Sequence, residues 1–112
     1  MKKVIITLAV MLISLGLFAH SASTVKLRFD IKTKLLYVNF EHGVKNVSEH
    51  FISNIDVKVN DKLVVTHKVL VQDKLTGGAV VYKIAGLNPG DKIMVTTECN
   101  KGGKQSGSTT VK

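Results

Sequence analysis

Cys99 is the only cysteine of this 112-residue chain, and it stands where an apolar run meets the glycine pair Gly102 and Gly103. Three histidines, His42, His50 and His67, lie between residue 23 and this cysteine. A thiolate together with imidazole nitrogens suits iron, copper or zinc. We therefore take Cys99, His50 and His42 as candidate ligands of a single metal ion.

Each of these residues also has a structural explanation. A free cysteine packs well as a small apolar side chain, so Cys99 can be a buried residue at a strand end. It can also be a redox-active thiol or a thiol linked to a partner. His50 can order the entrance of a strand, and His42 and His67 can be ordinary polar residues of the fold.

The first 23 residues have the features of a secretory signal peptide. Lys2 and Lys3 precede an apolar stretch over residues 4–18, and the triplets 19–21 and 21–23 that follow both have small residues at their first and last positions. The stretch is shorter than the roughly 20 residues of a spanning helix, although an uncleaved anchor is the alternative. We expect a periplasmic or secreted domain over residues 24–112, with no membrane contact after cleavage.

The formal net charge of +8 comes from basic residues that are scattered singly along the chain, without a run of five or more. Nucleic-acid binding usually needs a clustered basic stripe with stacking aromatic side chains. The distribution therefore argues against a nucleic-acid partner. It fits a solvated cationic face, or attraction to an acidic partner or anionic substrate.

Short runs of alternating apolar residues, separated by turn residues, predict strands throughout residues 24–112. The expected strands cover 25–31, 35–40, 51–59, 63–71, 79–85 and 93–99, with a final polar strand ending near 111. No segment long enough for a helix shows a period of 3.6 residues. About seven such strands predict an all-β fold, an immunoglobulin-like antiparallel β-sandwich in a single domain.

The strand pattern also predicts where the candidate ligands lie. Cys99 shares its face with Ile93, Val95 and Thr97, so we expect it to point inward at one end of the core. His67 shares a face with apolar residues and is expected to point inward too. His42 and His50 flank the loop between the second and third strands, which can lie at the same end as Cys99.

Two segments of the chain resemble a known family. The segments Glu49–Ile55 and Cys99–Gly103 resemble the Glu-His and Cys-Asn-x-His-Gly motifs of the desulfoferrodoxin, neelaredoxin and superoxide reductase iron domain. The resemblance covers about residues 35–111. It implies an immunoglobulin-like sandwich that holds one iron ion by four histidines and one cysteine and reduces superoxide to peroxide. It matches His50 and Cys99 to two of these ligands.

The chain departs from the family pattern at the other ligand positions. Gly102 stands where the family has the histidine of its cysteine motif, and Val44 stands at another histidine position, with His42 displaced by two residues. The family's early Glu-Lys-His-Val-Pro segment has no counterpart. Three histidines after residue 23 cannot complete a four-histidine centre, so we expect no full superoxide reductase centre.

The chain also resembles the Z subunit of the Sox sulfur-oxidation carrier complex. This resemblance rests on His50–Ile52, on the turn at Asn60–Val64 and on the segments Gly90–Val95 and Cys99–Gly102. It implies a sandwich without a catalytic residue that binds a sulfur-carrier subunit in thiosulfate oxidation. Against it, Cys99 takes the place of an aspartate.

The sequence thus leaves two hypotheses. One is a secreted desulfoferrodoxin-like domain that binds iron or another metal ion with a redox role and that receives electrons from a protein donor. The other is a non-catalytic subunit that binds a sulfur-carrier partner. The incomplete ligand set argues against an enzyme without deciding the question. The separation of Cys99 and His50 distinguishes the hypotheses, because two ligands of one ion must lie within about 4 to 5 Å.

Overall fold

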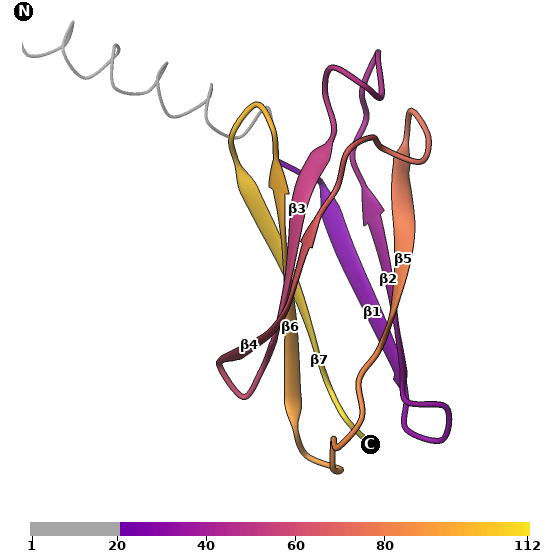
Figure 1. Cartoon of the computed structure of the whole chain (residues 1–112), viewed down its shortest axis with the longest axis vertical. Helices are drawn as coiled ribbons and strands as arrows, with labels where there is room; N and C mark the ends of the chain where they lie inside the picture. The colour runs from indigo at the N-terminus through magenta and orange to yellow at the C-terminus, as the bar shows by residue number, and fades with distance from the viewer. Residues whose placement is uncertain (1–20) are drawn as a thin grey trace, which may run out of the picture.

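A computed structural model describes residues 21–112, and these residues form seven antiparallel β-strands (Figure 1). The strands are β1 Thr24–Asp30, β2 Leu35–Glu41, β3 Ile52–Val59, β4 Lys62–Lys68, β5 Gly77–Lys83, β6 Lys92–Cys99 and β7 Lys104–Thr110. Within the described residues there is no helix long and apolar enough to cross a membrane. The expected signal peptide lies outside these residues, apart from its last three positions.

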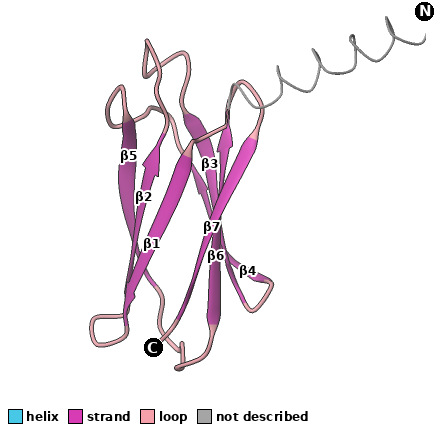
Figure 2. Cartoon of the chain, turned by 180° about the vertical axis from the view of Figure 1, so that it is seen from behind, coloured by secondary structure: helices cyan, strands magenta, loops and turns pink. Residues whose placement is uncertain are grey.

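The strands form two sheets that pack face to face. One sheet has the order β1-β2-β5 and the other has the order β4-β3-β6-β7. At one side of the sandwich β1 packs against β7, as the view from behind shows (Figure 2). The all-β sandwich expected from the sequence is therefore confirmed.

The core consists of side chains that alternate along the two inner faces. Leu36 and Val38 of β2 face Val57 of β3 and Ile93 and Val95 of β6, and all five are completely buried. The buried residues recur at every second position, as the apolar residues do in the sequence. This pattern arises because successive side chains of a strand point to opposite faces. The packing of these two apolar faces holds the sheets together.

Two turns between strands have backbone angles that explain their residues. Asn60 and Asp61 have φ of 49° and 68°, which a two-residue hairpin between β3 and β4 requires. Gly90 has φ of 97° in the turn that leads into β6, and the N–H of Asp91 donates to the carbonyl of Asn88. The polar turn residues were therefore reliable markers of the strand ends.

Most strand boundaries agree with the sequence prediction to within one residue, but two strands differ by more. The expected strand over 63–71 ends at Lys68, where the chain leaves the sheet. The strand expected over 79–85 instead begins at Gly77 and ends at Lys83, because Gly77 and Gly78 belong to β5 and pair with Glu41 and Phe40. A Cβ atom on Gly77 would overlap with the carbonyl oxygen of Phe40, so glycine here permits a close approach of two strands.

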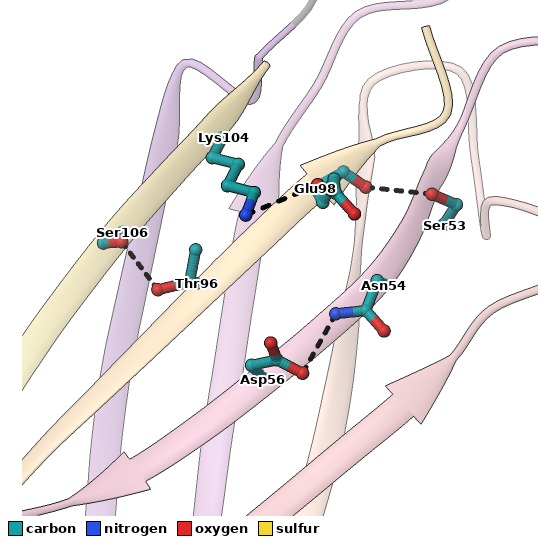
Figure 3. A network of polar contacts seen from close by, with 7 residues as sticks. All are labelled: Ser53, Asn54, Asp56, Thr96, Glu98, Lys104 and Ser106. Atoms are coloured by element: carbon teal, nitrogen blue, oxygen red, sulfur yellow. Dashed lines mark hydrogen bonds and ion pairs between the residues drawn. The ribbon is translucent and has the colours of Figure 1, made fainter. Parts of the chain in front are cut away.

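The outer face of the four-stranded sheet carries polar side chains (Figure 3). Thr96 of β6 bonds Ser106 of β7 at 2.8 Å, and Lys104 forms an ion pair with Glu98 at 3.6 Å. Asn54 donates to Asp56 along β3 at 3.0 Å. Because Thr96 and Glu98 occupy the outer face, the alternate residues of β6 point inward, and Cys99 is among them.

Candidate metal centre

Three of the candidate ligands meet at one end of the sandwich. The connections β2–β3, β4–β5 and β6–β7 gather at this end, at the top of Figure 1. His42 directly follows β2, His50 lies two residues before β3, and Cys99 is the last residue of β6. One ligand atom from each of the three lies within 4.8 Å of the other two.

His50 and Cys99 are in direct contact. The Nε2 atom of His50 lies 3.1 Å from the Sγ atom of Cys99. The rings of His42 and His50 meet edge to face, with centroids 4.8 Å apart and planes at 89°. The separation of His50 and Cys99 is therefore short enough for both to bind one ion, for which about 4 to 5 Å is the limit.

A β-bulge at the start of β3 helps to place His50. Ile52 and Ile55 are both fully buried although they are three residues apart, which a regular strand does not allow. The register shifts between Ile52 and Asn54, so Ser53 is an extra residue, and Ile52 pairs with Cys99. The bulge thus keeps both isoleucines inside while the chain before β3 passes across the end of β6.

Asn100 fixes the residues on both sides of His50. Its backbone N–H donates to the carbonyl of Phe51, and the N–H of Phe51 donates to its side-chain oxygen, both at 3.0 Å. Its side-chain amide donates to the carbonyl of Glu49 at 2.9 Å. Because Asn100 directly follows Cys99, these three bonds connect the cysteine to the segment that carries the histidine.

Gln72 determines which nitrogen of His42 carries the proton. The amide nitrogen of Gln72 donates to the carbonyls of His42 and Lys74 at 2.8 and 2.9 Å, which orients its side chain. Its Oε1 atom lies 2.7 Å from Nδ1 of His42 and also accepts from the N–H of Ile52 at 3.3 Å. An amide oxygen only accepts, so Nδ1 is the protonated nitrogen and Nε2 carries the lone pair that a cation needs.

The thiol of Cys99 is only 2% exposed, and its surroundings have opposing effects on its pKa. Burial raises the pKa of Cys99, while the backbone N–H of Lys101, 3.4 Å from Sγ, and the charge of Lys101 lower it to a lesser extent. The protein alone therefore favours the neutral thiol. A bound cation would favour the thiolate, because a metal ion deprotonates a coordinating thiol.

His67 lies outside this group. It points inward from β4, as expected, but its Nδ1 atom lies 2.7 Å from the hydroxyl of Tyr82 on β5. The two rings are nearly perpendicular, with centroids 5.7 Å apart. His67 and Tyr82 therefore connect the two sheets, and the structure gives this histidine a packing role away from the cluster.

The position that the resemblance assigns to a further histidine is a glycine in a left-handed conformation. Gly102 has φ of 99° in the β6–β7 turn, which a side chain rarely adopts. Among residues 21–112 the cluster thus has one thiol and two imidazoles. This set does not fit an iron centre with four histidines and one cysteine.

An open hollow lies beside the cluster. Its volume is about 600 Å³, and its lining includes His50, Glu49, Lys45, Lys101 and Leu75. Cys99 and His42 do not line it, and both are nearly fully buried. Of the three candidate ligands, His50 is the one that faces the hollow.

Sequence reasoning found His42, His50 and Cys99 but gave no role to the residues that hold them. Gln72 was missed because it directly follows an apolar run and resembles a polar residue at a strand end. Asn100 belonged to a recognised motif, and its bonds to Glu49 and Phe51 depend on a strand pairing that local sequence does not reveal.

The fold and the cluster together define a class: antiparallel β-sandwiches with histidine and cysteine side chains gathered at one end. Solved structures with this fold include a superoxide reductase (neelaredoxin) from Ignicoccus hospitalis, with a TM-score of 0.59 and 14% identity over 81% of this chain and 80% of that chain. A neelaredoxin from Archaeoglobus fulgidus in the reduced form has a TM-score of 0.51 and 15% identity over 83% and 89% of the two chains.

A third similar structure is a hypothetical protein from Pyrococcus horikoshii OT3, with a TM-score of 0.57 and 19% identity over 81% of this chain and 89% of that one. No protein-family model and no curated protein matches the chain. At these identities the likeness concerns the fold, so the chain has a superoxide reductase-like, or desulfoferrodoxin-like, fold.

Proposed function

We propose that this protein binds a single metal ion through His42, His50 and Cys99 and that the bound ion has a redox role. The observation that carries the proposal is the convergence of three ligand atoms, from three separate segments, within 4.8 Å. The atoms that would hold the ion are Nε2 of His50, Sγ of Cys99 and Nε2 of His42, whose Nδ1–H donates to Gln72.

The surroundings of the cluster support the proposal. Ligand histidines usually donate their second ring nitrogen to a fixed acceptor, and Gln72 provides this acceptor for His42. The N–H of Lys101 faces the sulfur, where it would stabilise a thiolate. Two superoxide reductases have a similar fold, so this kind of sandwich is compatible with a redox function.

The proposal is for metal binding and not for a complete superoxide reductase centre. The resemblance implies five protein ligands for iron, whereas the described residues bring three together. We therefore infer a domain with the reductase fold and a reduced ligand set. Its location in the periplasm or outside the cell, and a protein that supplies it with electrons, belong to the same proposal.

Metal binding is tested by equilibrium dialysis of the protein under reducing, anaerobic conditions. Fe(II), Zn(II) and Cu(I) are offered separately, and bound metal is measured by mass spectrometry. We expect about one ion per chain for at least one of them, and loss of binding in Cys99→Ser. Thr97→Ser is the matched control, because Thr97 is buried on the same face of β6. Retention of no ion by the unmodified protein would contradict the proposal.

A second candidate function is a non-catalytic sandwich that binds a sulfur-carrier partner, as a Sox Z subunit does. The supporting observation is an apolar edge on and after β4, made of exposed side chains: Leu63, Val64, Leu70, Val71 and Leu75. This function predicts that the protein purifies together with a protein that ends in a cysteine-bearing tail. A stable monomer without such a partner would count against it.

A further inference from the structure

We propose that the ion at His42, His50 and Cys99 is copper in the Cu(I) state, held by these three side chains alone. The inference rests on the proposed function, because it names the ion for the same site. It also follows from the disagreement between this donor set and the iron centre implied by the resemblance.

The number of donors is the first argument. Within residues 21–112 the group contains no fourth histidine or cysteine and no carboxylate. Zinc normally takes four ligands, and a site with three protein ligands keeps a place for water. Two imidazoles and a thiolate in a trigonal arrangement are typical of copper, and soft sulfur ligands select Cu(I).

Burial is the second argument. Cys99 is 2% exposed and His42 is 3% exposed, so solvent reaches the group mainly along His50, which lines the open hollow. An ion that needs water molecules to complete its coordination has little access to them between two buried ligands. An ion that is satisfied by three protein ligands fits this position better.

Net charge is the third argument. One thiolate and one Cu(I) ion cancel, whereas one thiolate with Zn(II) or Fe(II) leaves a positive charge among buried side chains. A buried charge is costly unless a partner compensates it. The hollow beside the cluster offers no excess of negative charge, since its lining contains Lys45 and Lys101 but one carboxylate, Glu49.

Binding of the ion needs no oxidant or reductant when Cu(I) itself is supplied. The sulfur–hydrogen bond of the Cys99 thiol breaks, the sulfur–copper bond forms, and one proton leaves to solvent. The N–H of Lys101, 3.4 Å from Sγ, remains directed at the sulfur and stabilises its negative charge.

The test is a competition titration of the anaerobic protein against a Cu(I) chelator whose Cu(I) complex is coloured, in the presence of excess Zn(II) and Fe(II). We expect one Cu(I) per chain, withdrawn from the chelator and not displaced by the other ions. X-ray absorption of this complex is expected to show one sulfur and two nitrogen neighbours around copper.

Variants distinguish copper binding by all three side chains from copper binding by the Cys99 thiol alone. His50→Gln keeps Cys99, and we expect it to lower the Cu(I) affinity by at least about tenfold, since even outer-shell losses cost roughly 10- to 100-fold. His67→Gln is the matched control, because His67 contacts Tyr82 outside the group. Circular dichroism of each variant verifies that the sandwich is folded.

The outcomes separate this inference from the proposed function. Preference for Zn(II) or Fe(II) at a Cys99-dependent site would overturn the assignment of copper and leave the metal site in place. Equal Cu(I) affinity of the unmodified protein and His50→Gln would overturn the three-ligand site. Failure to bind any of the three ions would overturn the proposed function as well.

Discussion

Gln72 is the residue on which the chemistry of His42 most depends. Its side chain is 3% exposed, and each of its polar atoms bonds the chain around the cluster. The two carbonyls that accept from its nitrogen prevent rotation of the amide. The protonation of His42 is therefore set by a residue 30 positions away in the sequence.

We predict that Gln72→Met lowers both metal affinity and stability. Without the amide oxygen, Nδ1 of His42 loses its acceptor, and outer-shell changes of this kind cost roughly 10- to 100-fold in affinity. Buried polar groups left without partners cost about 1 to 3 kcal/mol. Metal competition and urea denaturation measure the two effects. Gln105→Met, on β7, is the control, and an unchanged affinity in Gln72→Met would contradict the role of Gln72.

The candidate ligands could be predicted from the sequence, whereas their supports could not. Cysteine and histidine are rare in this chain and carry distinctive chemistry, so Cys99, His50 and His42 were recognisable individually. Gln72 and Asn100 act through bonds to backbone groups of other segments. Such bonds depend on strand register and loop path, which short-range patterns do not contain.

At the scale of the strands, the contact between His67 and Tyr82 connects the two sheets. It joins β4 of one sheet to β5 of the other, on the side of the sandwich away from the packing of β1 against β7. Burial raises the pKa of Tyr82 to about 12. The neutral phenol is thus the form that the folded protein favours.

We predict that the burial of Tyr82 makes the protein less stable at high pH. The unfolded chain releases the phenolic proton near pH 10, whereas the folded chain holds it until about pH 12. The stabilisation is therefore complete below pH 10 and is lost as the pH rises toward 12. Ultraviolet absorbance of the phenolate follows the titration, and Tyr82→Phe removes this step. A phenolate signal from Tyr82 near pH 10 in the folded protein would contradict the prediction.

At Gly107 the strand β7 lies close to the backbone of β1. A Cβ atom at this position would overlap with the carbonyl oxygen of Val25, which is backbone and cannot rotate away. We predict that Gly107→Ala lowers the free energy of unfolding by about 1 to 3 kcal/mol, as overpacking does. Thermal and urea denaturation measure the loss.

Gly43→Ala is the matched control for this substitution. A Cβ atom on Gly43 would meet nothing within 4 Å, so we expect a much smaller change. Equal losses in the two variants would show that the β1–β7 approach is not the cause.

The alternation of apolar and polar residues predicted most strands, but the glycine pair Gly77 and Gly78 gave an incorrect start for β5. Gly77 and Gly78 resemble a turn, but they continue β5 because Phe40 of the neighbouring strand lies against them. A local pattern cannot distinguish a glycine that bends the chain from one that makes room for another strand.

At the scale of the whole molecule, residues that precede the first strand also belong to the folded domain. Ala22 is 1% exposed and belongs to the core, and the N–H of Ser23 donates to the carbonyl of Glu41 at 2.8 Å. Both residues fall within the second of the two expected signal-peptidase motifs, at 21–23. The sandwich fold itself could be predicted, since strand number and alternation define it.

We predict that cleavage of the proposed signal peptide leaves Ala22 on the protein, because its removal would expose part of the core. The mass of the protein isolated from the cells that produce it, or its N-terminal sequence, measures the cleavage point. A mature chain that begins at Thr24 with unchanged stability would contradict the prediction. A protein engineered to begin at Thr24 provides the comparison.

The cluster joins parts of the chain that are far apart in sequence, since His50 and Cys99 are separated by 49 positions. In an unfolded chain these donors are dispersed, so an ion that binds all three acts as a cross-link of the folded state alone. Such an ion raises stability in proportion to the logarithm of its free concentration. The melting temperature of this single-cysteine protein is then expected to depend on the metal supply of its surroundings.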